Sequence, residues 1–226
     1  MPVMDEFREE REAIRHAPFQ KKLEYFKDYY LLATVVIVFA AAVGGAYLYS
    51  VLTAKQTALY AVLVNFIELE HSTEEIAEVF TEAELNPKKE TVVIDHSSYI
   101  SADSNEINFL KYGYEDEQRL FSMVMTGDID LFISGQDVVE RYAEQEWFDD
   151  LTGILTEDIL QRFEAEERLF TFRGKPIGIR VDDSSVMKRS YYYNGKKGET
   201  VYACIPANST HHETAMKFVQ FLLNAD

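Results

Sequence analysis

Four polar residues of this chain stand where an α/β sheet commonly holds its ligand. They are Asp95, His96, Ser134 and Asp182, each at or just after the end of an apolar run. In open α/β sheets the ligand lies at the carboxyl ends of the strands. Carboxylate, imidazole and hydroxyl groups that converge there can bind a polar ligand through hydrogen bonds. The pattern predicts a ligand-binding site of these four residues; the alternative is that they only cap loops.

Other residues that could carry chemistry stand in settings that do not favour catalysis or metal binding. His211 and His212 are adjacent, so their side chains diverge and make a poor metal pair. Asp128 and Asp130 lack the further, regularly spaced oxygen ligands of a Ca²⁺ loop. Cys204 is the only cysteine, which excludes an intramolecular disulfide. We find no nucleophile beside a base, so we expect no catalysis, no metal and no cofactor.

An aromatic run, Tyr191-Tyr192-Tyr193, follows one predicted helix. Exposed tyrosine rings could form a stacking platform for a sugar or for a partner protein. A cluster at the edge of the core is the alternative role, and both interpretations stay open.

Apolar strands alternate with amphipathic helices over residues 56–226. The expected strands are Thr57–Ile67, Thr91–Asp95, Ile129–Ser134, Ile177–Val181 and Thr200–Ile205. Helical spacing of apolar residues predicts helices at about 72–85, 114–125, 135–145, 156–163, 184–192 and 210–223. The strands are apolar throughout, which is typical of strands that are buried on both faces. We therefore predict an α/β domain with a mostly parallel sheet and helices on both faces.

A transmembrane helix is predicted at residues 29–54, which contain no charged residue. The core of this run, Leu31–Leu52, would span about 33 Å as a helix, enough to cross the lipid bilayer. Tyrosines stand near both ends, as in the aromatic belts of membrane helices. A cleaved signal peptide is the alternative, but the apolar run is long for one and the segment before it is long and rich in acids.

Basic residues predict the orientation of this helix. Lys55 is the only basic residue between the apolar run and Lys88, whereas several precede the run: Arg11, Arg15, Lys21, Lys22 and Lys27. The positive-inside rule then places residues 1–28 in the cytoplasm and residues 56–226 outside the cell. Small residues at Ala40, Ala41, Gly44 and Gly45 could pack two such helices together, so a homodimer is one expected arrangement.

The chain carries a formal net charge of −17 at pH 7. Acidic and basic residues nearly balance over residues 1–30, so almost all of the net negative charge belongs to the predicted outer domain. A surface this acidic repels phosphate backbones, which makes nucleic acid an unfavourable partner.

Three stretches carry a resemblance to a known family. The first, Leu120–Ile133, has the pattern of a helix that ends in Gly and is followed by an Asp-containing strand. The second, Trp147–Thr152, is an acidic segment that ends in Asp-Leu-Thr. The third, Ile205–Leu223, has the pattern of a strand end, a Pro and an Ala-x-x-Phe-x-x-Phe-Leu helix. Together they resemble the sugar-type extracellular solute-binding proteins of bacterial ABC importers, whose flytrap fold has two lobes. Residues 56–226 are too few for both lobes, so the resemblance implies one lobe of a periplasmic-binding-protein-like fold.

The resemblance implies a function that does not involve catalysis. Because one lobe cannot enclose a solute, we expect a membrane-anchored interaction or sensing module that associates with a membrane or surface protein. The alternative is a solute-binding protein of an importer whose cleft is completed by a second copy. The whole chain is also similar to membrane-anchored proteins of Gram-positive bacteria, a similarity that implies no activity.

Overall fold

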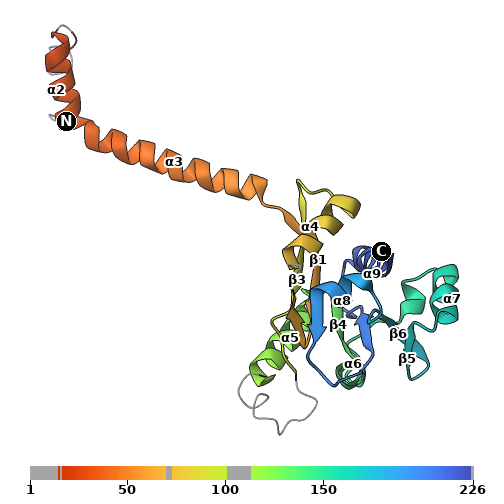
Figure 1. Cartoon of the computed structure of the whole chain (residues 1–226). Coiled ribbons are helices and arrows are strands. Elements are labelled where there is room, and N and C mark those ends of the chain that lie inside the picture. Colours follow the sequence, from red (N-terminus) through yellow and green to blue (C-terminus); the bar gives the residue numbers. More distant parts are fainter. Residues whose placement is uncertain (1–14, 16, 70–72, 101–112, 225–226) are drawn as a thin grey trace. The chain divides into compact units, whose positions relative to one another are not determined.

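The structure is a computed structural model that describes residue 15 and residues 17–69, 73–100 and 113–224 (Figure 1). The chain divides into two compact units, residues 1–54 and residues 55–226. Most of the predicted cytoplasmic segment 1–28 lies outside the described residues. The described part of the first unit consists of α2 (Phe19–Tyr29) and α3 (Leu31–Thr53). Within the described part of the chain, α3 is the one helix long and apolar enough to cross a membrane.

The second unit is built on a mixed sheet with the strand order β3-β1-β4-β8-β6-β5. These strands are β1 (Gln56–Leu63), β3 (Glu90–Asp95), β4 (Leu131–Gly135), β5 (Leu169–Phe172), β6 (Lys175–Arg180) and β8 (Val201–Cys204). β1 is parallel to both β3 and β4. β8 is antiparallel to its neighbours β4 and β6, and β5 is antiparallel to β6. The α/β class is therefore confirmed.

The prediction of a mostly parallel sheet is only partly right, because three of its five neighbouring pairs are antiparallel. The physical reason lies in the last third of the chain. Arg173 and Gly174 both have positive φ, 48° and 81°, which is the backbone of a tight hairpin turn. This turn joins β5 directly to β6, so no helical crossover is needed there.

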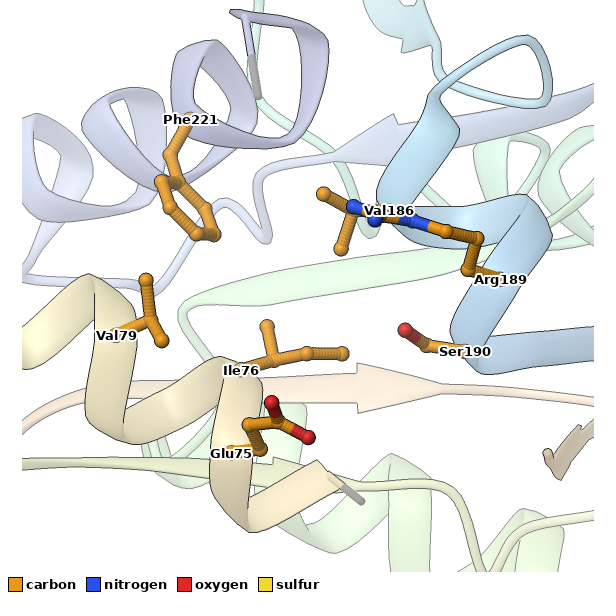
Figure 2. Close-up of a pocket in the computed structure, with 7 residues that line it drawn as sticks. All are labelled: Glu75, Ile76, Val79, Val186, Arg189, Ser190 and Phe221. Atoms are coloured by element: carbon orange, nitrogen blue, oxygen red, sulfur yellow. The ribbon is translucent and has the colours of Figure 1, made fainter. Parts of the chain in front are cut away.

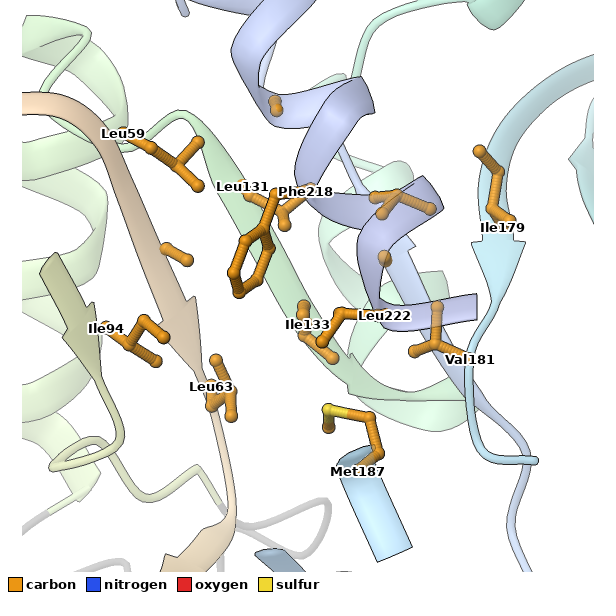
Figure 3. Close-up of a cluster of buried hydrophobic side chains, with 14 of the residues drawn as sticks. Leu59, Leu63, Ile94, Leu131, Ile133, Ile179, Val181, Met187, Phe218 and Leu222 are labelled. Atoms are coloured by element: carbon orange, nitrogen blue, oxygen red, sulfur yellow. The ribbon is translucent and has the colours of Figure 1, made fainter. Parts of the chain in front are cut away.

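Helices cover both faces of the sheet, as predicted. One face carries α4 (Thr73–Glu84), α8 (Ser185–Ser190) and α9 (His212–Asn224), which pack on the first core. Figure 3 shows part of that core, where Phe218 of α9 faces Leu131 and Ile133 of β4. The other face carries α5 (Tyr114–Thr126) and α6 (Gln136–Ala143), which pack on the second core.

The sequence of β1 is apolar without alternation because both faces of this strand are buried. Leu59, Ala61 and Leu63 belong to the first core, whereas Val62 belongs to the second core and Tyr60 packs against it. Successive side chains of a strand point to opposite faces, and here both faces are buried. The apolar run therefore reports two cores rather than one.

A second, two-stranded sheet was not predicted. It pairs β2 (Phe66–Glu68) with β7 (Tyr191–Tyr193) in antiparallel fashion. The predicted strand Thr57–Ile67 is divided because Asn65 has a positive φ of 66° and turns the chain. The Asn65 side chain fixes this turn through hydrogen bonds to the backbone N and O of Ile100, both 2.7 Å long. The predicted helix through residue 192 is wrong at its end, since α8 stops at Ser190.

Short elements connect β4 to β5. They are α6, the 3₁₀ turn Leu151–Gly153 and α7 (Glu157–Ala165). α7 buries Phe163 in the first core. The helices predicted near 135–145 and 156–163 are confirmed, with small differences at their ends.

Candidate functional site

The edge of the sheet at which β1, β3, β4 and β6 end, here called the carboxyl edge, holds the four predicted site residues. Asp95 closes β3, and His96 follows it. Ser134 stands one residue before the end of β4, and Asp182 follows β6. The shared edge agrees with the expected placement, but their surroundings differ.

Asp95 is fixed by residues of the chain itself. Its carboxylate accepts hydrogen bonds from Ser97 N at 2.8 Å, Ser97 Oγ at 2.6 Å and Tyr60 Oη at 3.2 Å. Although burial acts to raise it, these hydrogen bonds and the charge of Arg119 hold the pKa of Asp95 below its usual value. Asp95 is thus an ionised group whose oxygens are largely used within the loop.

His96, Ser134 and Asp182 occupy three different places. His96 Nε2 lies 3.6 Å from Glu68 Oε2, and its ring centroid is 6.2 Å from that of Tyr191. Ser134 is fully buried and donates to the carbonyl oxygen of Val64 at 3.2 Å. Asp182 lines an open hollow beside β7. No hydrogen bond or ion pair joins any two of the four within the described part of the chain.

Tyr193 and Glu199 occupy the centre of this edge. Sequence reasoning named Tyr193 only as part of the aromatic run 191–193, and it missed Glu199. Both side chains lie over Gly135, the last residue of β4. A Cβ atom added to Gly135 would lie 2.6 Å from Tyr193 Cζ and 2.8 Å from Glu199 Oε2, and closer still to Tyr193 Oη. Tyr193 Oη donates to Glu199 Oε2 at 3.5 Å. Only a glycine leaves room for this arrangement at the end of β4.

The side chain of Glu199 also contacts the first turn of helix α6. Its Oε1 accepts a hydrogen bond from the backbone N of Asp137 in the first turn of α6, at 2.5 Å. The first N–H groups of a helix lack partners within the helix and favour a negative charge. The Glu199 carboxylate therefore accepts from a helix N–H group that would otherwise be available to bind an anion.

The place that Tyr193 and Glu199 fill is the switch point of the sheet. From β1 the chain crosses to β3 on one side, and β4 then lies on the other side of β1. In open α/β sheets ligands bind outside the carboxyl ends of the strands at such a point. The chain's own side chains thus occupy the position where a ligand would be expected.

Burial and charge both act on Tyr193. Burial, together with the charges of Asp137 and Glu199, raises the pKa of the Tyr193 hydroxyl. Hydrogen bonds with Ser134 and Asn65 act in the opposite direction. The Tyr193 hydroxyl therefore stays protonated and remains a hydrogen-bond donor at neutral pH.

Two open hollows flank these side chains, and both include Glu199 in their walls. One has a volume of about 240 Å³ and is lined mainly by the tyrosines of β7, Phe66, Met187, Lys188 and Asp182. The other has a volume of about 330 Å³ and is lined by the start of α6 and the segment 196–200. Aromatic rings and charged groups in these walls are suited to binding a polar partner, whereas no group of three metal-ligating side chains exists within the described residues.

Glu199 should make the stability of the domain depend on pH near neutrality. Burial raises its pKa to about 7, and the Asp137 carboxylate adds to the rise. A carboxyl group whose folded pKa exceeds its unfolded value stabilises the fold while protonated, so this contribution is complete below about pH 4.5 and is lost as the pH rises through about 7. We expect Glu199→Gln to flatten the fall in stability between about pH 5 and pH 8.

This pH dependence can be measured by urea unfolding of the full chain in detergent micelles. The fluorescence of Trp147, the only tryptophan and buried in the second core, reports unfolding. Glu140→Gln is the matched control, because Glu140 lines the same hollow but is exposed. An unchanged pH profile in Glu199→Gln would show that another group titrates.

The fold and the site define an α/β domain with a mixed sheet, a carboxyl edge filled by its own side chains, and one apolar helix ahead of it. Comparison of the chain with protein-family models, with curated proteins and with solved structures found no match.

Proposed function

We propose that the chain is a single-pass membrane protein that carries an extracellular interaction or sensing module. α3 spans the bilayer, with residues 1–28 in the cytoplasm and residues 56–226 outside. None of its 23 residues is buried, as expected of a helix whose solvent is lipid. Phe19, Leu23 and Phe26 of α2 are also exposed, at 77%, 57% and 42% of their surface, and suit a helix at the membrane interface.

The observation that carries the module hypothesis is the filled switch point. A solute that bound at the end of β4 would have to displace Tyr193 from Gly135 and Glu199 from the first turn of α6. Both side chains are held by hydrogen bonds, so displacement costs free energy that a small ligand must repay. A domain of this kind is better suited to recognise a partner protein than to capture a free solute. The resemblance to one lobe of a solute-binding protein supports the same function.

The outward face of the β2–β7 sheet is the surface we assign to the partner. Ile67 and Tyr192 are cross-strand neighbours on this face, with 49% and 57% of their surfaces exposed. Leu69, which follows β2, is 45% exposed. Tyrosine and large apolar residues that are exposed together are typical of protein interfaces. The partner is a membrane or surface protein.

A solute-binding protein completed by a second copy is the alternative function. Two observations favour it: the hollows of about 240 and 330 Å³ meet at Glu199, and both are open to the surface. A second copy placed over them would enclose a volume of the size that small-molecule sites usually have. The small residues Gly44 and Gly45 of α3 could help to pair two copies.

Photo-crosslinking in native membranes distinguishes these functions. We expect Tyr192 replaced by p-benzoylphenylalanine in the full chain to crosslink to another protein, and the same replacement at Thr171 to give no product. Thr171 is exposed on β5 at the far edge of the sheet, so it is the matched control. A crosslink between two copies would favour the solute-binding alternative. Equal products at both positions would contradict a specific surface at Tyr192.

A further inference from the structure

A third hollow lies on the face of the sheet that carries α4, α8 and α9 (Figure 2). Its volume is about 180 Å³, and it shares no lining residue with the hollows at the carboxyl edge. The lining residues are Glu75, Ile76 and Val79 of α4, Val186, Arg189 and Ser190 of α8, and Phe221 of α9. Ile76 and Val186 form the buried wall, at 6% exposure each, and Val79 stands exposed at the side of α4. Most of the wall is thus apolar.

Arg189 is the feature of this hollow that points to a ligand. Its Nε donates to the backbone O of Ser185 at 3.4 Å, but its terminal nitrogens have no ion pair or hydrogen bond with any described residue. The chain carries 39 acidic residues against 22 lysines and arginines. A guanidinium without a carboxylate is therefore unexpected here, since it offers donors in a planar fork that fits a carboxylate.

Ser190 adds a second polar group beside Arg189. Only 3% of the residue is exposed, and its hydroxyl is not among the buried polar side-chain atoms left without a hydrogen-bond partner. Figure 2 shows the Ser190 hydroxyl and the Arg189 side chain directed from α8 toward α4. A hydroxyl group can donate a hydrogen bond to a carboxylate, so Ser190 can assist Arg189 in holding one in this hollow.

We propose that this hollow binds a small amphipathic carboxylate. The carboxylate accepts hydrogen bonds from Arg189 and from the Ser190 hydroxyl, while the apolar body packs on Ile76, Val79 and Phe221. The volume of about 180 Å³ is smaller than the sites of drug-sized ligands, so it suits one aromatic ring or one branched aliphatic chain. This site is independent of the proposed function, because it does not use the carboxyl edge or Tyr192.

Two sources offer this chemistry, a free apolar amino acid and an apolar acid without an amino group. Glu75 of α4 lines the same hollow as Arg189. A carboxylate at that position would favour the ammonium group of an amino acid. Comparison of 4-fluoro-L-phenylalanine with 3-(4-fluorophenyl)propanoate therefore separates the two sources.

The test is ¹⁹F NMR titration of each probe with the full chain in lipid nanodiscs, with empty nanodiscs subtracted. We expect at least one probe to bind with a Kd of about 0.1–1 mM, as is usual for ligands of this size. Arg189→Gln should weaken binding at least tenfold. Arg173→Gln is the matched control, since Arg173 is also exposed and has no ion pair with a described residue, but lies in the β5–β6 turn. It should leave the Kd unchanged.

A second variant guards against a change in folding. Val79→Trp should block the hollow from its exposed side while Arg189 stays in place, and it should abolish binding with an unchanged urea midpoint. Binding of neither probe to the wild-type chain, or equal affinity in wild type and Arg189→Gln, would overturn the proposal. Neither result would affect the crosslink expected at Tyr192, so the two proposals fail separately.

Discussion

Asp130→Ala should lower the free energy of unfolding by about 3–5 kcal/mol. The Asp130 carboxylate is buried, with 4% of the side chain exposed. Its Oδ2 accepts a hydrogen bond from Tyr60 N at 2.9 Å, and its Oδ1 accepts one from Ser209 Oγ at 2.9 Å. His211 Nδ1 lies 3.0 Å from Oδ1. These bonds join the start of β4 to β1 and to the segment before α9. Alanine would leave the half-buried N–H of Tyr60 and the buried hydroxyl of Ser209 without this acceptor.

Urea unfolding followed by Trp147 fluorescence measures this loss. Asp128→Ala is the matched control, because Asp128 is two residues away, exposed, and accepts only from the nearby Thr126 hydroxyl among the described residues. We expect the control to cost less than about 0.5 kcal/mol. Equal losses in the two variants would contradict the role assigned to the buried carboxylate.

Asp130 illustrates what the sequence could not distinguish. Asp128 and Asp130 stand at the same apolar run and look alike in the sequence. Their roles differ because Asp130 is buried beside Ser209 and His211, which come from about 80 residues further along the chain, whereas Asp128 is exposed in the segment before β4. That His211 pairs with a buried carboxylate depends on tertiary contacts and had no sequence signal.

The main elements of the fold could be predicted because their patterns are local. The strands Thr91–Asp95 and Ile129–Ser134, and the helices of both faces, follow from apolar runs and helical spacing. β5, β2 and β7 could not be predicted, since each is short and is stabilised by a partner strand rather than by its own pattern. The antiparallel pairing of β8 also depends on the position of distant strands.

The candidate site was predicted only by its location. The rule that ligands lie at the carboxyl ends of strands led to Asp95, His96, Ser134 and Asp182, and all four stand at that edge. The groups at its centre, Tyr193 and Glu199, come from a segment that follows α8 by a few residues. Two signals were available. One was the tyrosine run 191–193, and the other was Gly135 directly after an apolar run, because a glycine at the end of a strand can mark a close approach of other groups.

Gly135→Ala should cost about 2 kcal/mol, because the new methyl group would overlap with the Tyr193 side chain. The backbone of Gly135 is not the cause, since its φ of −67° suits any residue. The same substitution should cost less than about 0.5 kcal/mol in a Tyr193→Ala chain, where the ring is absent and only the flexible end of Glu199 must move.

A double-mutant cycle on these two positions tests whether the chain fills its own switch point. Urea unfolding of the wild type, both single variants and the double variant gives the coupling free energy, which we expect to be about 1.5 kcal/mol. Gly153→Ala is the matched control, since nothing lies within 4 Å of a Cβ added there. If the effects of Gly135→Ala and Tyr193→Ala simply add, the tyrosine does not occupy the end of β4. The position would then be free for a solute, and a solute-binding protein would be favoured over a partner-binding module.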